Sequence, residues 1–154
     1  MSTDEEKREI ERLKWRLDFA QKRFARFIEI LESTLDESTL RDVIERLGRE
    51  CSKTVTAIQE YKDNPEGFFA GVLKGWGEEA EFDREGGVIR IVTSERECVC
   101  PLVNSQLTPE CICDCSLGWQ KQTYETMLGR PVAVELKESA LRGSKRCVFE
   151  VRLT

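Results

Sequence analysis

The sequence predicts an α+β fold in which N-terminal helices are followed by a four-stranded, mostly antiparallel sheet, with one helix between the two hairpins. Up to Gly77 the apolar residues recur every three or four positions, which is the period of an amphipathic helix. After Gly77 they alternate with polar residues, which is the period of a half-buried strand. The 154 residues are the usual size of one domain. We therefore expect a single domain, 1–154, with a helical part of about 1–77 and a remainder of about 78–154 that holds the sheet, a cysteine loop and one helix.

The first helix is predicted by apolar residues whose spacing alternates between three and four. These residues are Ile10, Leu13, Leu17, Ala20, Phe24, Phe27 and Leu31. Four more apolar residues, Trp15, Phe19, Ile28 and Ile30, widen the stripe beyond a strict two-position seam. A wide stripe favours a helix that packs on its own domain. A homodimer formed through this N-terminal helix is the alternative.

Two further helices are expected before Gly77. The stretch STLDESTL interrupts the first helix and offers Asp36 or Ser38 as the N-cap of the second. The second helix carries apolar residues at helical spacing over 40–61, and Cys51 lies on that apolar stripe. The third follows Asn64-Pro65 and ends at Gly77, because glycine commonly terminates helices.

The sheet is predicted by two hairpin signals with a helix between them. We expect strands at 79–83, 88–93, 132–137 and 146–153, and a helix at about 116–128. The segments near 88–94, 132–138 and 146–153 should all lie in one antiparallel sheet. In the last strand Cys147, Phe149 and Val151 alternate with polar residues, which places them on one face.

Composition excludes several classes of protein. The net charge of −5, from 24 basic and 29 acidic residues, argues against a nucleic-acid or anionic-membrane surface. No apolar run approaches the roughly 20 residues that cross a bilayer. The charged N-terminal sequence lacks a secretory signal, so we expect a cytoplasmic protein whose thiols stay reduced. The absence of histidine excludes imidazole from every catalytic or metal-binding role.

The cysteines carry the strongest chemical signal in the chain. Five of the seven fall between Cys98 and Cys115. In an extended segment residues i and i+2 point the same way, so Cys98-x-Cys100 can aim two sulfurs at one centre. Cys115 lies where a helix is expected to begin, and the amides there favour a thiolate. Soft thiolates without histidine indicate zinc first and iron second. A loop of reduced thiols and a redox pair are the alternatives.

Two resemblances extend these predictions. From Gly118 onward the chain resembles the closing half of the 4-vinyl reductase domain family. The matching residues are Gly118, Gly129 to Val132, Glu135 or Glu138, Gly143, Cys147 and Phe149. A larger part resembles uncharacterised cysteine-rich bacterial and archaeal proteins, some of them labelled amino-thiazoline carboxylic acid hydrolase-like. The matching blocks are Gly48 to Cys51, Cys100 to Val103 and Cys113 to Trp119.

The resemblance implies an α+β fold with a ligand pocket between sheet and helices and a thiolate-rich metal site. It selects Cys51, Cys100, Cys113 and Cys115 as metal ligands, because these four fall on the matching blocks, with Cys147 and then Cys98 as substitutes. Helical periodicity alone would instead make Cys51 a core residue. Related sensor domains hold heme through a histidine that this chain lacks, so no heme is expected.

The sequence therefore predicts a small-molecule-binding protein with a cysteine-ligated metal site, most simply zinc. Phe68, Phe69, Trp76 and Trp119 would line a pocket for a small apolar or aromatic ligand. Ordinary core packing is the alternative role for these aromatic residues. A hydrolase that uses metal-bound water or a cysteine thiolate is the second functional class, and a dimerising scaffold or interaction protein is the third.

Overall fold

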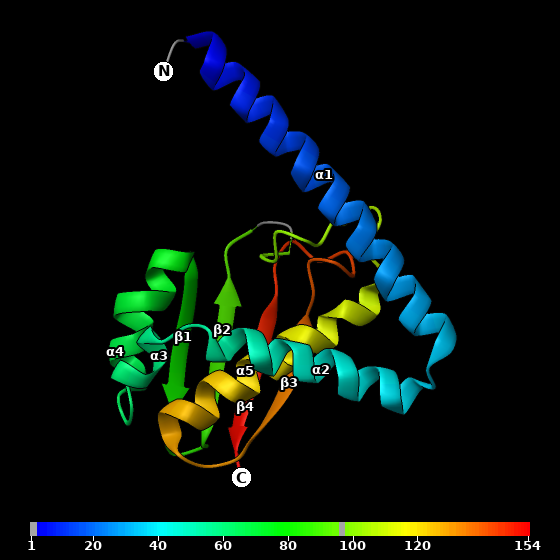
Figure 1. The fold of residues 1–154 in the computed structure, drawn as a ribbon. Coiled ribbons are helices and arrows are strands. Elements are labelled where there is room, and N and C mark those ends of the chain that lie inside the picture. Colours follow the sequence, from blue (N-terminus) through cyan, green and yellow to red (C-terminus); the bar gives the residue numbers. More distant parts are fainter. Residues whose placement is uncertain (1–2, 96–97) are drawn as a thin grey trace.

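The computed structural model describes residues 3–95 and 98–154, and helices precede strands as the sequence predicts (Figure 1). The helical part contains α1 (Thr3–Thr34), α2 (Glu37–Lys53), α3 (Ala57–Glu60), α4 (Pro65–Phe68), the π-helix η1 (Phe69–Leu73) and the 3₁₀ helix η2 (Lys74–Trp76). The remainder contains β1 (Glu78–Asp83), β2 (Val88–Thr93), the 3₁₀ helix η3 (Glu110–Ile112), α5 (Cys113–Leu128), β3 (Val132–Glu138) and β4 (Val148–Leu153).

The four strands form one antiparallel sheet in the order β1-β2-β4-β3. In its centre, Ile89 of β2 lies opposite Phe82 of β1 and Val151 of β4. All three segments predicted to share an antiparallel sheet do so, and α5 separates the two hairpins. The predicted α+β fold is confirmed.

One hydrophobic cluster, which we call the sheet core, fills the space between the inner face of the sheet and the helices. Figure 1 shows α5 and α2 crossing that face. The buried members are Ile58, Phe68, Leu73, Ile89, Ile91, Tyr124, Met127, Val132, Phe149 and Val151. Burial of this apolar surface is the main favourable contribution to folding.

A second and smaller cluster, the loop core, lies among α1, α2 and the segment that leads into α5. Its buried members are Ile28, Leu40, Ile44, Val103 and Ile112. Among the partly buried residues packed against it are Cys98, Cys100, Cys111 and Cys115. Thiols therefore take part in packing here, as free cysteines often do.

The two helices α2 and α5 meet at a pair of glycines. A Cβ added to Gly48 would lie 1.8 Å from the carbonyl oxygen of Cys115, and one added to Gly118 would lie 1.8 Å from that of Glu45. Only glycine therefore allows the two backbones to come this close. Buried beside the crossing, the hydroxyls of Ser52 and Thr123 form a hydrogen bond of 2.9 Å.

Helix boundaries depart from the sequence prediction at three places, and β4 begins at Val148 instead of 146, so Cys147 precedes the strand. The second predicted helix ends at Lys53, where the Thr54 hydroxyl donates to the Cys51 carbonyl, and α3 continues the apolar period after a turn. The third changes from α to π to 3₁₀ geometry along its length. The helix expected at about 116 begins at Cys113. The N-cap prediction is confirmed at Asp36, whose carboxylate accepts from the Thr39 amide at 2.9 Å.

The long helix α1 is only partly integrated into the domain. Its buried residues are Ala25 and Ile28, both in the C-terminal half, while the N-terminal half extends beyond the remaining elements (Figure 1). The core-helix prediction therefore holds for the C-terminal half alone. No helix in residues 3–95 and 98–154 combines the length and the apolarity that a membrane span requires.

Candidate functional site: a thiol cluster and a buried tyrosine

The crossing of α2 and α5 brings two of the predicted metal ligands close together. Cys51 follows Gly48 by one helical turn, and Cys115 lies in the first turn of α5, with its backbone against Gly48. Glycine at this position therefore sets the approach of the two thiols as well as that of the two helices. The close approach of α5 thus explains the glycine of the block Gly48 to Cys51.

Cys115 is the centre of the cysteine cluster. Burial raises the pKa of its thiol to about 12, and the negative charge that Cys51, Cys100, Cys98 and Cys113 would carry as thiolates adds to the increase. Each of these four thiols is therefore close enough to Cys115 to act on its charge. Three predicted ligands and the substitute Cys98 thus lie around the fourth predicted ligand, Cys115. We call these five residues the thiol cluster.

Hydrogen bonds hold the edge of the thiol cluster. The sulfur of Cys113 lies 3.3 Å from the Ser139 hydroxyl, and burial raises the pKa of the Cys113 thiol. The sulfur of Cys147, the other substitute, accepts from the Ala140 amide at 3.4 Å. Burial also raises the pKa of Cys98, whereas the backbone amide of Cys100 lowers it by donating to the Cys98 sulfur. The β3–β4 connection therefore borders the cluster.

Proximity does not amount to metal-ligand geometry. Within the described residues, no three cysteine, aspartate or glutamate side chains are placed so that they could hold a metal ion. Zinc binding therefore stays a prediction. One alternative is wrong, however: Cys51 is exposed, not a core residue, although helical periodicity places it on the apolar stripe of α2.

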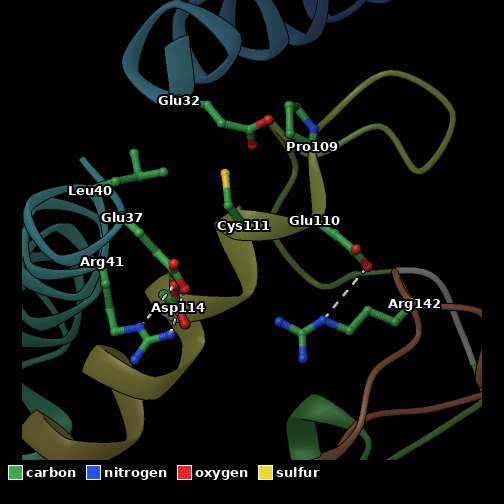
Figure 2. A pocket seen from close by; sticks show the side chains of 9 residues that line it. All are labelled: Glu32, Glu37, Leu40, Arg41, Pro109, Glu110, Cys111, Asp114 and Arg142. Atoms are coloured by element: carbon green, nitrogen blue, oxygen red, sulfur yellow. Dashed lines mark ion pairs between the residues drawn. The ribbon is translucent and has the colours of Figure 1, made fainter. Parts of the chain in front are cut away.

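Cys111 belongs to a different environment, a surface pocket of about 510 Å³ between α1, α2 and the start of α5 (Figure 2). Burial and then the neighbouring Glu32 carboxylate raise the pKa of the Cys111 thiol to about 12. A thiol so strongly protonated is a poor nucleophile at neutral pH.

Charged side chains surround Cys111 in the pocket. Arg41 lies 3.9 Å from Asp114 and 3.7 Å from Glu37, and Arg142 lies 3.7 Å from Glu110. Figure 2 shows these pairs on opposite sides of the opening. Burial raises the pKa of Asp114, opposed by the positive charges of the two arginines. The pocket keeps an excess of negative charge, because its lining has four carboxylates and only two arginines.

The predicted aromatic residues lie next to one another beside the sheet core. The ring centroids of Phe68 and Trp76 are 6.0 Å apart with planes near perpendicular, and those of Trp76 and Trp119 are 6.2 Å apart. Phe68 is fully buried, whereas the two tryptophans are half-buried. Their grouping matches the sequence analysis, and their role in ligand binding stays a prediction.

Tyr124 is the residue that sequence reasoning missed. Its side chain is 0% exposed, and its hydroxyl has no hydrogen-bond partner among the described residues. Burial raises the pKa of this phenol above its usual range, and Glu78 adds to the increase. A buried hydroxyl without a partner lowers stability. The helical period alone could place Tyr124 on the inner face of α5 but could not reveal the missing partner.

A helical segment of irregular geometry packs beside Tyr124. This segment is the π-helix Phe69–Leu73, and the ring centroid of Phe69 lies 6.4 Å from that of Tyr124. π-helical turns occur frequently at functional sites. On its other side, Phe69 lines a surface pocket of about 730 Å³ together with Ala80 and Phe82. Phe69 therefore contacts both the surface pocket and the ring of Tyr124.

Comparison with known proteins defines the fold but not a family. No family model matches the sequence, and no curated protein matches it. The structure is similar to trafficking protein particle complex subunit 3 from Naegleria fowleri covalently bound to palmitic acid, with a TM-score of 0.51, 18% identity, and coverage of 89% of this chain and 96% of that chain. It is also similar to the phenol-responsive sensory domain of the transcription activator PoxR with phenol, with a TM-score of 0.55, 12% identity, and coverage of 86% and 74%.

A vinyl-4-reductase family protein from Methanocaldococcus jannaschii is the third similar structure. Its TM-score is 0.46 at 17% identity, with coverage of 89% of this chain and 93% of that chain. That TM-score is too low to establish a shared fold. The first two likenesses show an α+β fold shared with proteins of other sequence, and membership of the 4-vinyl reductase family stays a prediction.

Proposed function

We propose that the domain binds a small, largely apolar molecule that carries one polar group. The observation that carries the proposal is the Tyr124 hydroxyl, which is enclosed among apolar side chains without a partner in the described part of the chain. Ligand sites are mostly apolar and contain a few polar groups that fix orientation. A ligand hydroxyl, carbonyl or carboxyl group at this point would satisfy the phenol and offset the loss of stability that its burial causes.

Access to Tyr124 requires displacement of Phe69. Phe69 is among the residues that line the surface pocket of about 730 Å³, and its ring centroid lies 6.4 Å from that of Tyr124. A swing of this one ring would open a route toward the buried hydroxyl.

The two structures that share the fold support this ligand class. One contains palmitic acid and the other phenol, and each molecule combines an apolar body with one oxygen-bearing group. The aromatic residues Phe68, Trp76 and Trp119 would supply the apolar lining in this chain. Phenol suits the dimensions of a single displaced side chain and is the first compound to test.

Tryptophan fluorescence provides the test. Trp15 is far from the sheet core and 65% exposed, so a Trp15→Phe background leaves the signal to Trp76 and Trp119. Titration with phenol should quench or shift this emission saturably, and Tyr124→Phe should weaken binding about tenfold through loss of one hydrogen bond. Tyr61→Phe removes the only other tyrosine hydroxyl and should leave the affinity unchanged. Absence of saturable binding of both phenol and palmitic acid would contradict the proposal.

We further infer that the thiol cluster holds one zinc ion with a structural role. Zinc suits the type of donor, because thiolates are soft ligands and the chain has no histidine. Cys51, Cys100, Cys113 and Cys115 are the proposed ligands, with Cys98 or Cys147 as substitutes. The ion would neutralise thiolates that otherwise repel one another, and would join α2 and α5 to the loop.

Metal analysis of the reduced protein tests the zinc site. Purified protein should contain one equivalent of zinc, and removal by a chelator should lower Tm, because metal binding is coupled to folding. Cys51→Ala should lower the zinc content of the protein. It should also lower the free energy of unfolding by several kcal/mol. Cys111→Ala is the matched control, since its sulfur faces the Glu32 pocket instead of the cluster. Full zinc occupancy in Cys51→Ala with an unchanged response to chelator would remove Cys51 from the ligand set.

A further inference from the structure

The N-terminal half of α1 exposes apolar side chains that no other element of the described chain covers. The heptad residues Ile10, Leu13 and Leu17 are 50%, 50% and 46% exposed, and Phe27 in the C-terminal half is 53% exposed. They lie on one stripe, with the half-buried Phe24 and Leu31 that pack on the loop core continuing it toward the domain. A helix segment that leaves its own domain has little stability in isolation. The stripe therefore requires a covering partner.

We propose that this stripe pairs with the same stripe of a second copy of the chain, as a short parallel two-stranded coiled coil. In the heptad set by the stripe, Ile10, Leu17 and Phe24 take position a, and Leu13, Ala20 and Phe27 take position d. Glu6 occupies the preceding d position, so the apolar seam begins at Ile10. This interaction is independent of ligand or metal binding.

Charge complementarity selects a second copy in parallel orientation. In a parallel coil a residue at g faces the partner residue five positions further on, at e. Glu9 at g then faces Lys14 of the second copy, and the symmetry of the pair repeats the contact. Lys14 forms no ion pair within the described residues, whereas Glu9 pairs with Arg12 of its own helix at 2.6 Å and would share its carboxylate with the partner's Lys14. The next g residue, Arg16, faces a neutral glutamine.

The antiparallel alternative is disfavoured by the same residues. The antiparallel register that matches a with d throughout places Ile10 opposite Phe27 and Leu17 opposite Ala20 of the second copy. That register brings position g next to position g, so Arg16 faces Arg23. Like charges at flanking positions destabilise a coil, whereas opposite charges set its orientation.

Contacts with the domain limit the length of the pair. Gln21 donates to the Pro101 carbonyl at 2.8 Å, and from Gln21 onward α1 is fixed against the loop core. The two helices should therefore pair most closely from Ile10 to Ala20 and separate beyond. A coil of this length forms a weak dimer.

The opposite face of α1 supplies a matched control. Trp15 and Phe19 stack with ring centroids 5.6 Å apart, and the Arg23 guanidinium lies 5.6 Å from the centre of the Phe19 ring. Both aromatic residues fall at outer heptad positions, f and c, and stay outside the seam. Substitution there changes exposed apolar area without touching the proposed contact.

Sedimentation equilibrium of the full chain tests the pairing. The weight-average mass should rise from 17.8 kDa toward twice that value as the concentration approaches the order of 100 µM. Leu13→Glu and Leu17→Glu should each keep the chain monomeric, whereas Trp15→Glu should dimerise like the wild type. Circular dichroism checks that each variant stays folded. A wild type that stays at 17.8 kDa would overturn the proposal.

A charge exchange tests the orientation. Glu9→Lys sets two lysines against each other across the pair, and Lys14→Glu sets two glutamates against each other, so each variant alone should dimerise about tenfold more weakly. In an equimolar mixture, a Glu9→Lys chain can pair with a Lys14→Glu chain, and both flanking contacts of this parallel heterodimer then join a lysine to a glutamate. The mixture should therefore dimerise about as strongly as the wild type. A readout within one kind of chain complements the mixture.

The double variant Glu9→Lys with Lys14→Glu supplies that readout. It exchanges the two charges within one chain, so both contacts of the symmetric parallel pair become attractive again, and the affinity should return to within about twofold of the wild type. No recovery in the double variant would overturn the parallel arrangement. A monomeric wild type that co-sediments with phosphatidylserine vesicles would identify the stripe as lipid-binding and overturn the proposal.

Discussion

The sheet core and the loop core are built from different kinds of side chain. The sheet core has ten buried members, all of them apolar or aromatic, supplied by every strand except β1 and by four helical segments. The loop core has five, and the partly buried residues packed against it are Phe24, Leu31, Leu35, Leu141 and four cysteines. The burial of the larger sheet core supplies most of the hydrophobic stabilisation. The loop core is smaller, and cysteines make up half of its partly buried residues.

The two cores therefore differ in the polar groups that they contain. The sheet core packs the sheet against the helices and contains one polar atom without a partner in the described residues, the Tyr124 hydroxyl. The loop core contains the cysteines, whose positions depend on the helix crossing at Gly48 and Gly118. That crossing is the common boundary of both cores, so a change there should disturb both, whereas changes within either core should act locally.

Gly118→Ala should have the largest effect on stability, because the added methyl group would push α2 and α5 apart at their crossing. The added Cβ would lie 1.8 Å from the Glu45 carbonyl oxygen, and backbone cannot move aside as a flexible side chain can. We expect the free energy of unfolding to fall by about 3 kcal/mol or more. Urea denaturation followed by circular dichroism measures this loss.

Gly75→Ala is the control for helix glycine substitution. A Cβ at Gly75 meets nothing within 4 Å, so this variant should stay within about 0.5 kcal/mol of the wild type. Equal losses in the two variants would mean that glycine flexibility, not the helix crossing, determines the effect. Loss of the thiol cluster in Gly118→Ala, detected as faster alkylation of Cys115, would show that the crossing also positions the sulfurs.

The sheet core was predictable from the sequence because periodicity encodes it. Alternation over 88–93 and 148–153 identifies the residues that face inward, and the turn between β1 and β2 fixes which strand pairs first. Boundaries were less accurate, since tertiary contacts decide where α2 ends and where α5 begins. The helix crossing was not predictable, because a glycine inside a helical pattern signals weakness as readily as close approach.

The thiol cluster was only partly predictable. Sequence proximity identified the five cysteines from Cys98 to Cys115, and the family resemblance selected three of them and added Cys51, which no local pattern would have joined to the others. Periodicity alone wrongly placed Cys51 in the core, because Gly48 and Ser52 lie on the buried face of α2 and Cys51 is exposed. Tyr124 could not be found, since the missing hydrogen-bond partner is a property of the packed interior.

Tyr124→Phe tests the sheet core by removing its one unpaired polar atom. Without ligand, the substitution should raise the free energy of unfolding by about 1 kcal/mol, because a buried hydroxyl without a partner is removed and the ring is retained. Tyr61→Phe, at a half-buried ring packed on Phe68, should change stability by less than about 0.5 kcal/mol. A marked destabilisation by Tyr124→Phe would show that the hydroxyl has a partner in solution, such as a bound water.

The smallest effect concerns the loop core, and it appears only at alkaline pH. The pKa of Cys115 is raised from 9.0 to about 12, so the folded metal-free protein holds this proton more tightly than the unfolded chain does. Its contribution to stability is complete below pH 9.0 and is lost as the pH rises from 9.0 through about 12. Urea unfolding of reduced, chelator-treated protein up to about pH 10 samples the start of this loss. The stability of Cys115→Ser should decline less steeply over the same pH range.

The stability of zinc-loaded protein should show no such decline, because a bound cation favours the thiolate and reverses the sign of the linkage. An equally steep decline in metal-free and zinc-loaded protein would separate Cys115 from the metal site.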